Sequence, residues 1–354
     1  MNTILAPGKL RCCTALFLLL ALIAIAGCQG SGGRQAEHGY VAAVQVSLRD
    51  RVAPVFDKTG TVSNAERVEI LERSKNGRFV RVRSPRNEEG WMEQRYLASQ
   101  AVFDLFQKIS ADNTGWPVQG HATTRASLNM HAEPGRESPA LYQLKEGEKL
   151  ELLKRASSEK PLVRGSEPAA PTAPPLAPVL EDWWLVRDSA QHAGWVLGRM
   201  IDLEAPIEVA QYAEGQRIVA CFLLDQVDDA GKSVPQYVML LNEPKDGNPA
   251  DFNQVRVFTW NVKRDRYETA YRQRKLAGML PVRTGFQEFG KEGKLPIFTL
   301  LLKGPTGEIQ PVTYKLNGAM VHRVLSPEEL AKSPVKASTP GKTPAAGPLP
   351  GARE

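Results

Sequence analysis

The sequence has little excess charge of either sign and only one long apolar run. Its 45 Lys and Arg residues face 39 Asp and Glu residues, and the net charge of +6 is too small to indicate nucleic-acid binding. The apolar run, Cys12–Ala26, is about 15 residues long, fewer than the roughly 20 that span a bilayer. We therefore expect no lasting membrane helix. A hydrophobic content of 42% also excludes a wholly disordered chain.

The first 27 residues have the features of an export signal. Lys9 and Arg11 precede the apolar run without an acidic residue, which is typical of a secretory signal peptide. The run ends in Ile25-Ala26-Gly27-Cys28, which resembles a bacterial lipobox with Ile where Leu is usual. The resemblance implies lipidation of Cys28 and a membrane as partner. The alternative is an ordinary signal peptide with a chance cysteine.

The residue after Cys28 indicates the destination of such a lipoprotein. In many bacteria with two membranes, an Asp at this position retains a lipoprotein at the inner membrane. The residue here is Gln29, so the resemblance favours the periplasmic face of the outer membrane if the cell has two membranes.

Cysteine is scarce, which excludes a disulfide framework. Of four cysteines, Cys12 and Cys13 lie in the signal segment and Cys28 is the expected anchor, so only Cys221 remains. An exported domain without disulfides depends on hydrophobic burial, and we therefore expect modules with ordinary apolar cores.

Two segments of the chain repeat each other. Residues 68–73 (VEILER) align with 150–155 (LELLKR), and 90–97 (GWMEQRYL) align with 194–201 (GWVLGRMI). Between these blocks, Phe79–Arg83 and Trp183–Arg187 are short runs rich in β-branched and aromatic residues, which predict strands. The repeat predicts two copies of one small β unit.

Both copies resemble the bacterial SH3 domain. The second has Ser127-Leu128-Asn129-Met130, then Trp183-Trp184-Leu185-Val186 and the closing Gly194-Trp195-Val196. The first opens with Ser47-Leu48-Arg49-Asp50 and has Phe79 where Trp is commoner. The resemblance implies two SH3-like barrels.

The segments outside the barrels differ in composition. Val102, Phe103, Phe106 and Ile109 have helical spacing and predict a connector helix within residues 99–112. Of the 26 prolines, six lie in an Ala-rich insertion at 156–181 and six in the tail after residue 326, where we expect disorder. The expected boundaries are 1–27 signal, 28–39 anchor and tether, 40–98 first barrel, 99–119 helix and linker, 120–203 second barrel, 204–326 β domain and 327–354 tail.

Residues 204–326 predict an antiparallel β domain, either a sandwich or an open barrel. We expect its strands at 217–224, 236–242, 254–261, 267–272, 295–303, 310–316 and 319–324, with turn signals between them. The strongest of these signals is Asn317-Gly318, which predicts a two-residue hairpin. The whole chain is thus expected to be all-β apart from the connector helix.

The residues that could carry chemistry are few. The five histidines form no recognisable nucleophile or zinc pattern, and we expect no metal and no cofactor. Cys221 lies in the apolar run Ile218–Leu224, which favours a buried structural thiol over a hydrolase nucleophile. We therefore expect a protein that is not an enzyme.

Two surfaces are candidates for binding. One is aromatic, because rings stack on sugars or peptide stems, and it comprises Trp91, Tyr96, Tyr142, Trp183 and Trp184. Adjacent residues of a strand face opposite ways, so we expect one ring of the Trp183–Trp184 pair to be exposed. The alternative for all these rings is a place in the core. The other surface is basic and would meet anionic polymers or lipid headgroups, unless it is a solvated hairpin edge; its residues are Lys263, Arg264, Arg266, Arg272, Arg274 and Lys275.

These observations predict a lipid-anchored protein of the bacterial envelope whose SH3-like barrels bind peptidoglycan or another envelope component without catalysis. An alternative is a scaffold that binds an envelope protein through the C-terminal β domain. A less favoured alternative is a hydrolase that uses Cys221.

Overall fold

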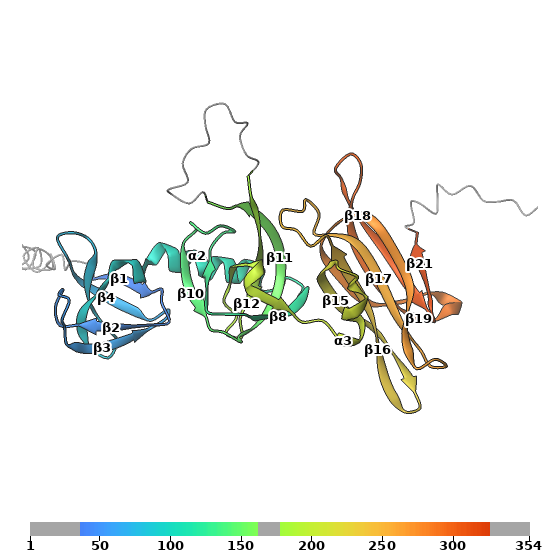
Figure 1. Ribbon diagram of the computed structural model, residues 1–354, viewed down its shortest axis with the longest axis horizontal. Coiled ribbons are helices and arrows are strands. Elements are labelled where there is room, and N and C mark those ends of the chain that lie inside the picture. Colours follow the sequence, from blue (N-terminus) through green and yellow to red (C-terminus); the bar gives the residue numbers. More distant parts are fainter. Residues whose placement is uncertain (1–35, 162–177, 326–354) are drawn as a thin grey trace, which may run out of the picture. The chain divides into compact units, whose positions relative to one another are not determined.

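The computed structural model describes residues 36–161 and 178–325, in which strands predominate and helices are few. The strands form three seven-stranded antiparallel sheets (Figure 1). This confirms the all-β fold expected from the sequence. The signal segment with Cys28, most of the Pro-rich insertion and the C-terminal tail lie outside the described residues. The chain divides into two compact units, residues 1–103 and 104–354.

The first unit contains one sheet in the order β3-β2-β6-β5-β4-β1-β7. Its elements are β1 Glu37–Val41, β2 Gln45–Arg49, β3 Lys58–Ser63, β4 Arg67–Arg73, β5 Phe79–Arg83, β6 Glu89–Glu93, the 3-10 helix η1 Gln94–Tyr96 and β7 Leu97–Ser99. Alternate residues of these strands face inward, as in Val80 and Val82 of β5, which are fully buried while Arg81 between them is exposed.

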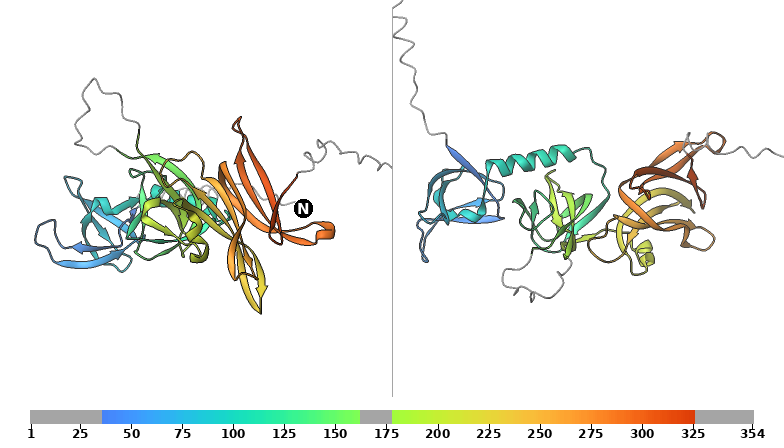
Figure 2. Two further views of the ribbon diagram at one scale, coloured as in Figure 1. Left: turned by 45° about the vertical axis from the view of Figure 1, so that its right-hand side comes forward. Right: turned by 90° about the horizontal axis from the view of Figure 1, so that it is seen from above.

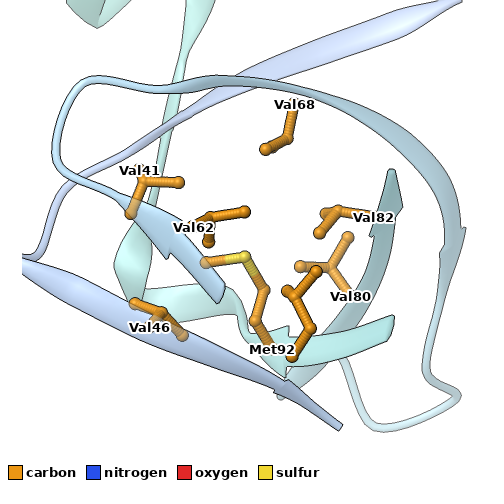
Figure 3. Packing of buried hydrophobic residues seen from close by; sticks show 8 residues of the cluster. Val41, Val46, Val62, Val68, Val80, Val82 and Met92 are labelled. Carbon is orange, nitrogen blue, oxygen red and sulfur yellow. The ribbon is translucent and has the colours of Figure 1, made fainter. Parts of the chain in front are cut away.

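The inward residues of the first sheet form one apolar core. Figure 3 shows the side chains of this cluster pointing into the interior of the barrel from several strands. Valine and leucine dominate this cluster, which suits strands because β-branched side chains pack well on a pleated surface. The cluster comprises Val41, Val46, Leu48, Val62, Val68, Val80, Val82 and Met92.

Helix α2, Gln100–Asn113, follows the first sheet and confirms the predicted connector helix. In the first unit, the Phe103 ring stacks on Tyr40 with ring centroids 4.0 Å apart. In the second unit, Phe106 is fully buried and meets the Tyr142 ring edge-on at 5.4 Å. The apolar residues at helical spacing are therefore packing residues.

The second sheet repeats the strand order of the first, β10-β9-β13-β12-β11-β8-β14. Its elements are β8 Gly120–Thr124, β9 Leu128–His131, β10 Ala140–Leu144, β11 Lys149–Glu159, β12 Leu180–Arg187, β13 Ala193–Leu197, the 3-10 helix η2 Gly198–Met200 and β14 Ile201–Leu203. Strands β11 and β12 stay paired as far as Glu159 and Leu180, so the barrel extends into the segment where we expected the insertion to begin.

The third sheet is a meander in which each strand pairs with the next along the chain, in the order β15 to β21. The short helix α3 Ile207–Ala210 and the 3-10 helix η3 Gln211–Ala213 precede it; its elements are β15 Arg217–Asp229, β16 Lys232–Asn242, β17 Phe252–Asn261, β18 Arg266–Glu288, η4 Gly290–Glu292, β19 Lys294–Lys303, β20 Ile309–Asn317 and β21 Met320–Val324. The views in Figure 2 show that this sheet is strongly twisted. It is a single sheet, so of the two expected forms the open one fits and the sandwich does not.

The sheet carries its apolar cluster on the side covered by α3 and η3. Val209 of α3 packs with Met239, Leu241 and Phe258, and Tyr212 of η3 lies against them. No helix among the described residues is both long and apolar enough to cross a membrane.

Candidate functional site

The outer face of the first sheet carries aromatic rings and arginines. Arg49 of β2 and Arg81 of β5 both lie opposite Trp91 of β6, so the three side chains share one face of the sheet. The Arg49 guanidinium lies over the Phe56 ring, 4.2 Å from its centroid, and 5.7 Å from the centroid of Phe79. These cation–π contacts hold flat, partly exposed rings beside a cation.

The loop between β2 and β3 extends this face with exposed apolar side chains. Val52, Val55 and Phe56 are 43%, 84% and 36% exposed. The carboxylate of Asp50 anchors the loop by accepting hydrogen bonds from the Asp57 backbone and the Arg51 side chain, and these bonds lower the pKa of Asp50. We call the set Arg49, Val55, Phe56, Phe79 and Trp91 the aromatic–arginine face.

The corresponding face of the second barrel is covered. His131 stands where Arg49 stands in the first barrel, and it contacts the Trp183 ring edge-on at 5.3 Å. Trp183 is 2% exposed and Trp184 is 8% exposed, so the expectation that one of these rings is exposed is wrong. Both faces of β12 are therefore covered. One face packs in the core of its own barrel, and the other is covered by residues that the alternation along the strand does not identify.

Helix α2 and the residue after it contact other parts of the second barrel. The backbone N–H of Ala193 donates to the Ser110 hydroxyl at 2.9 Å, and Arg187 donates to the carbonyls of Asn113 and Thr114. Tyr142, which the sequence also suggested as a ligand contact, is 5% exposed and stacks on His192 at 3.9 Å. Trp183, Trp184 and Tyr142 therefore have little surface to offer a ligand.

The other two aromatic candidates are only partly buried. Trp91 belongs to the aromatic–arginine face, and Tyr96 packs against the first core while Arg95 lies over its ring at 4.7 Å. Arg49 served in the sequence only as part of the motif that resembles the family, and Phe56 lies outside these motifs, so neither was expected at a binding surface. Arg49 of β2 and Trp91 of β6 are far apart in the sequence and become neighbours only because the two strands pair.

A cavity of about 350 Å³ lies between the second barrel and the β domain. Its wall is partly apolar, with Leu152, Trp184 and Ile218, and its charged residues are mostly paired with one another. The centre of the pairing is Asp182, which accepts hydrogen bonds from Arg155, Ser157, Arg217 and the Gly247 backbone. Arg155 also reaches Asp251 at 3.3 Å, and these groups tie the barrel to the β domain.

The electrostatics of the two buried carboxyls differ. Burial raises the pKa of Asp182, but the hydrogen bonds from Gly247, Arg155 and Ser157 outweigh it, and the net effect lowers that pKa. Burial also dominates at Asp251 and raises its pKa despite a hydrogen bond from the Leu280 backbone. Asp182 is thus the carboxylate that stays charged most readily in this junction.

The basic run splits into two groups on β18 and its turn. Arg264 and Arg266 pair with Glu268 at 2.9 and 3.1 Å. Arg272 and Arg274 instead point to Glu214, at 3.0 and 3.8 Å, together with the buried Arg256 at 2.6 Å. Lys263 and Lys275 are exposed. The sequence did not indicate Arg256, because it lies in the apolar run of β17.

Cys221 lies on β15 among apolar and tyrosine side chains. Burial raises the pKa of its thiol to about 12, so the thiol is protonated at neutral pH. Cys221 packs against the cluster that contains Val209, as Tyr237 and Tyr267 do, and a histidine is not among the described residues that pack with this cluster. The geometry does not favour a cysteine nucleophile here.

A metal centre is likewise not formed by the described side chains. Across residues 36–161 and 178–325, no group of three or more His, Cys, Asp or Glu side chains is close enough to hold an ion. Asp188 and His192 form a pair in which Nδ1–H of the imidazole donates to the carboxylate at 2.9 Å. The Tyr142 ring stacks on that imidazole, which makes the pair a packing element of the second barrel.

Comparison with known protein families identifies the first barrel. Residues 46–98 match the family model of the bacterial SH3 domain. This segment is therefore similar to the bacterial SH3 domain. The match runs from β2 to β7 and includes all five residues of the aromatic–arginine face. No curated protein matches the chain.

Several solved structures match a larger part of the chain. An NlpC/P60 family protein from Bacillus cereus has 10% identity and a TM-score of 0.22, with 67% of this chain and 99% of that chain covered. NlpC2 from Trichomonas vaginalis has 9% identity and a TM-score of 0.17, with 69% and 99% covered. NlpC1 from the same organism has 9% identity and a TM-score of 0.17, with 68% and 89% covered.

These matches correct one expectation. From the sequence we expect a protein that is not an enzyme, whereas the matching structures are named as an NlpC/P60 family protein and as NlpC2 and NlpC1. That expectation is therefore withdrawn. At such low identities and TM-scores the matches assign no catalytic residue to this chain.

Proposed function

We propose that the protein is an envelope lipoprotein that is anchored through Cys28 and binds peptidoglycan through the aromatic–arginine face of its first SH3 domain. The observation that carries the proposal is the exposed set of rings around Arg49, of which Phe56 is 36% exposed, on a bacterial SH3 domain. Flat rings bury apolar surface at low entropic cost, and the cation can bind carboxylates of a peptide stem.

The test measures retention on purified sacculi. We expect the chain without residues 1–28 to sediment with sacculi, and the double variant Arg49→Ala, Phe56→Ala to be retained at least fivefold less. The matched control is Leu223→Ala, because Leu223 is an exposed apolar residue of the β domain, 51% exposed. Equal retention of the double variant and the unchanged chain would count against the proposal, as would no retention at all.

The anchor is tested separately. The Ile25-Ala26-Gly27-Cys28 sequence supports lipidation of Cys28, and several acyl chains on one residue suffice for stable attachment. We expect Cys28→Ser to abolish incorporation of labelled palmitate and to move the protein to the soluble fraction. Incorporation that persists in this variant would refute the anchor without touching the peptidoglycan proposal.

A second candidate is a scaffold that binds an envelope protein through the β domain. Strand β21 pairs only with β20 among the described strands, and its Met320 is 62% exposed. An open sheet edge can accept a further strand from a partner. Crosslinking in cells from position 320, followed by mass spectrometry, would recover one protein partner if this candidate holds and none if it does not.

A further inference from the structure

Four donor-rich side chains form a square on one face of the β domain. Arg256 of β17 lies directly opposite Arg272 of β18, and Gln254 lies opposite Arg274. Residues two apart on a strand share a face, so all four side chains project to the same side. Like charges directly opposite each other destabilise a sheet, and this arrangement therefore needs an anion to offset it.

Glu214 supplies only part of the required charge. Among the described residues it is the only carboxylate paired with any of the three arginines, at 2.6 Å from Arg256, 3.0 Å from Arg272 and 3.8 Å from Arg274. Three guanidinium groups and one carboxylate leave a surplus of two positive charges. The Arg256 side chain is 3% exposed, and a buried cation is costly unless it is fully paired.

Two buried donors in the square also have no acceptor. Arg256 Nε and Gln254 Nε2 are both buried without a hydrogen-bond partner in the described structure. The amide orientation of Gln254 is set by its neighbours, since Arg272 and Arg274 both donate to its Oε1. Orphaned buried donors are rare and often mark the place of a missing water or ion.

The square is open to solvent at its rim. The side chains of Arg274 and Glu214 are 60% and 52% exposed, whereas Arg256 forms the buried floor. A ligand can therefore reach the arginines by replacing the Glu214 carboxylate. The partly exposed pairs of Glu214 with Arg272 and Arg274 contribute little stability, and a phosphate that replaces Glu214 keeps the buried Arg256 paired with an anion.

We propose that Arg256, Arg272 and Arg274 form a binding site for a phosphate group, and that Glu214 occupies the site when no ligand is bound. A phosphate carries up to two negative charges and has more acceptor oxygens than the carboxylate it replaces. It can therefore offset more of the positive charge and accept hydrogen bonds from all three guanidinium groups. This site is independent of the SH3 domain and of its ligand.

The experiment titrates the full chain, held in an uncharged detergent, with inorganic phosphate by calorimetry. We expect Glu214→Gln to tighten phosphate binding at least fivefold, because the internal competitor loses its charge. We expect the double variant Arg272→Ala, Arg274→Ala to weaken binding at least tenfold. If the three ion pairs had a purely structural role, the Glu214→Gln variant would not bind phosphate more tightly than the unchanged chain.

The matched control is the double variant Arg264→Ala, Arg266→Ala. It also removes two positive charges, one from the turn before β18 and one from the start of β18, but these two arginines pair with Glu268 instead of Glu214. We expect it to bind phosphate like the unchanged chain. Equal losses in the two double variants would overturn the proposal, as would a Glu214→Gln protein that binds no more tightly.

A second arm distinguishes the source of the phosphate. The chain and its variants are sedimented with vesicles of phosphatidylglycerol and, separately, of phosphatidylcholine. Stronger retention of Glu214→Gln on phosphatidylglycerol assigns the site to an anionic lipid headgroup. A response to inorganic phosphate with equal retention on both vesicles assigns it to a soluble phosphate. No difference between Glu214→Gln and the unchanged chain towards either probe overturns the proposal.

Discussion

Asp182 illustrates how one buried charge can join two domains. Its side chain is 4% exposed and pairs with Arg155 of the second barrel and Arg217 of the β domain. Removing one partner of a buried pair leaves an uncompensated charge, which is far costlier than losing an exposed pair. Loss of this carboxylate should therefore destabilise the junction.

We expect Asp182→Asn to lower the free energy of unfolding of residues 104–325 by about 3 to 5 kcal/mol. Asparagine keeps the shape of the side chain but leaves the buried Arg155 without one of its carboxylates. Urea denaturation followed by tryptophan fluorescence measures the loss. The matched control is Asp202→Asn, whose pair with Arg125 is exposed, and it should cost less than about 1 kcal/mol. Similar losses in both variants would contradict the assignment.

The acid limb of the stability profile provides a second test of Asp182. Because its pKa is lowered in the folded chain, its contribution is present above the unfolded pKa of about 3.9 and is lost as pH falls through the folded value. We expect the unchanged protein to lose stability more steeply than Asp182→Asn below about pH 4, and the two slopes to agree between pH 5 and 7. Parallel stability curves over the whole pH range would show that the pKa of Asp182 is not lowered in the folded protein.

The thiol of Cys221 should be unreactive in the folded protein. Its pKa of about 12 leaves roughly a thousandth of the thiolate of an ordinary cysteine at neutral pH. We expect a disulfide-exchange reagent to label the chain without residues 1–28, whose only cysteine is Cys221, slowly at pH 7.5 and at once in urea. Rapid labelling of the folded chain would reopen Cys221 as a nucleophile.

At the scale of the elements, local patterns predicted the strands but not their cover. The β-branched and aromatic run Phe79–Arg83 predicted a strand, and the first barrel has this strand with one exposed face. The expectation that a strand exposes one face failed at Trp183 and Trp184, because both faces of β12 are covered. The residues that cover a strand, such as His131 against Trp183, are distant from it in sequence. The sequence of the strand alone therefore does not reveal them.

Strand β18 is longer than the sequence predicted. We expected it to end at Arg272, whereas it continues to Glu288 and includes Pro281. The proline falls where the register between β18 and β19 shifts, between Met279 and Arg283, so its missing N–H interrupts no regular ladder. The first part of the strand pairs with β17 and the second with β19, a change of partner that sequence alone does not reveal.

Two equivalent glycines should resist substitution. A Cβ at Gly90 would lie 2.7 Å from Leu48 Cβ, and one at Gly194 would lie 2.3 Å from Met130 Cγ. We expect Gly90→Ala and Gly194→Ala each to destabilise their own barrel by about 1 to 3 kcal/mol, through overpacking. Thermal unfolding measures the effect. The control is Gly285→Ala on β18, where a Cβ meets nothing within 4 Å; a loss as large there would refute the packing argument.

At the scale of the whole molecule, the candidate sites could be predicted only in part. Sequence reasoning found Trp91 and the basic run, but it missed Arg49, Phe56 and Arg256. Each missed residue acquires its role from a partner across the sheet or from a loop, as Arg256 does from Glu214. Sequence motifs identify the barrel fold, whereas strand pairing decides which charged side chains lie next to each other.

The molecule should unfold in two separate steps. Residues 1–103 and 104–354 are distinct compact units, and Asp182 ties the second barrel to the β domain within the second unit. Calorimetry of the unchanged chain should therefore show one transition for the first SH3 domain and another for the second unit.

Two substitutions assign those transitions, because distant sites act independently. Gly90→Ala should lower only the transition of the first domain, by at least about 4 °C for a domain of this size, while Asp182→Asn should lower only the other. The double variant should show both shifts unchanged. A single transition that either substitution moves would mean that the units unfold cooperatively, and the division into two independent parts would then be wrong.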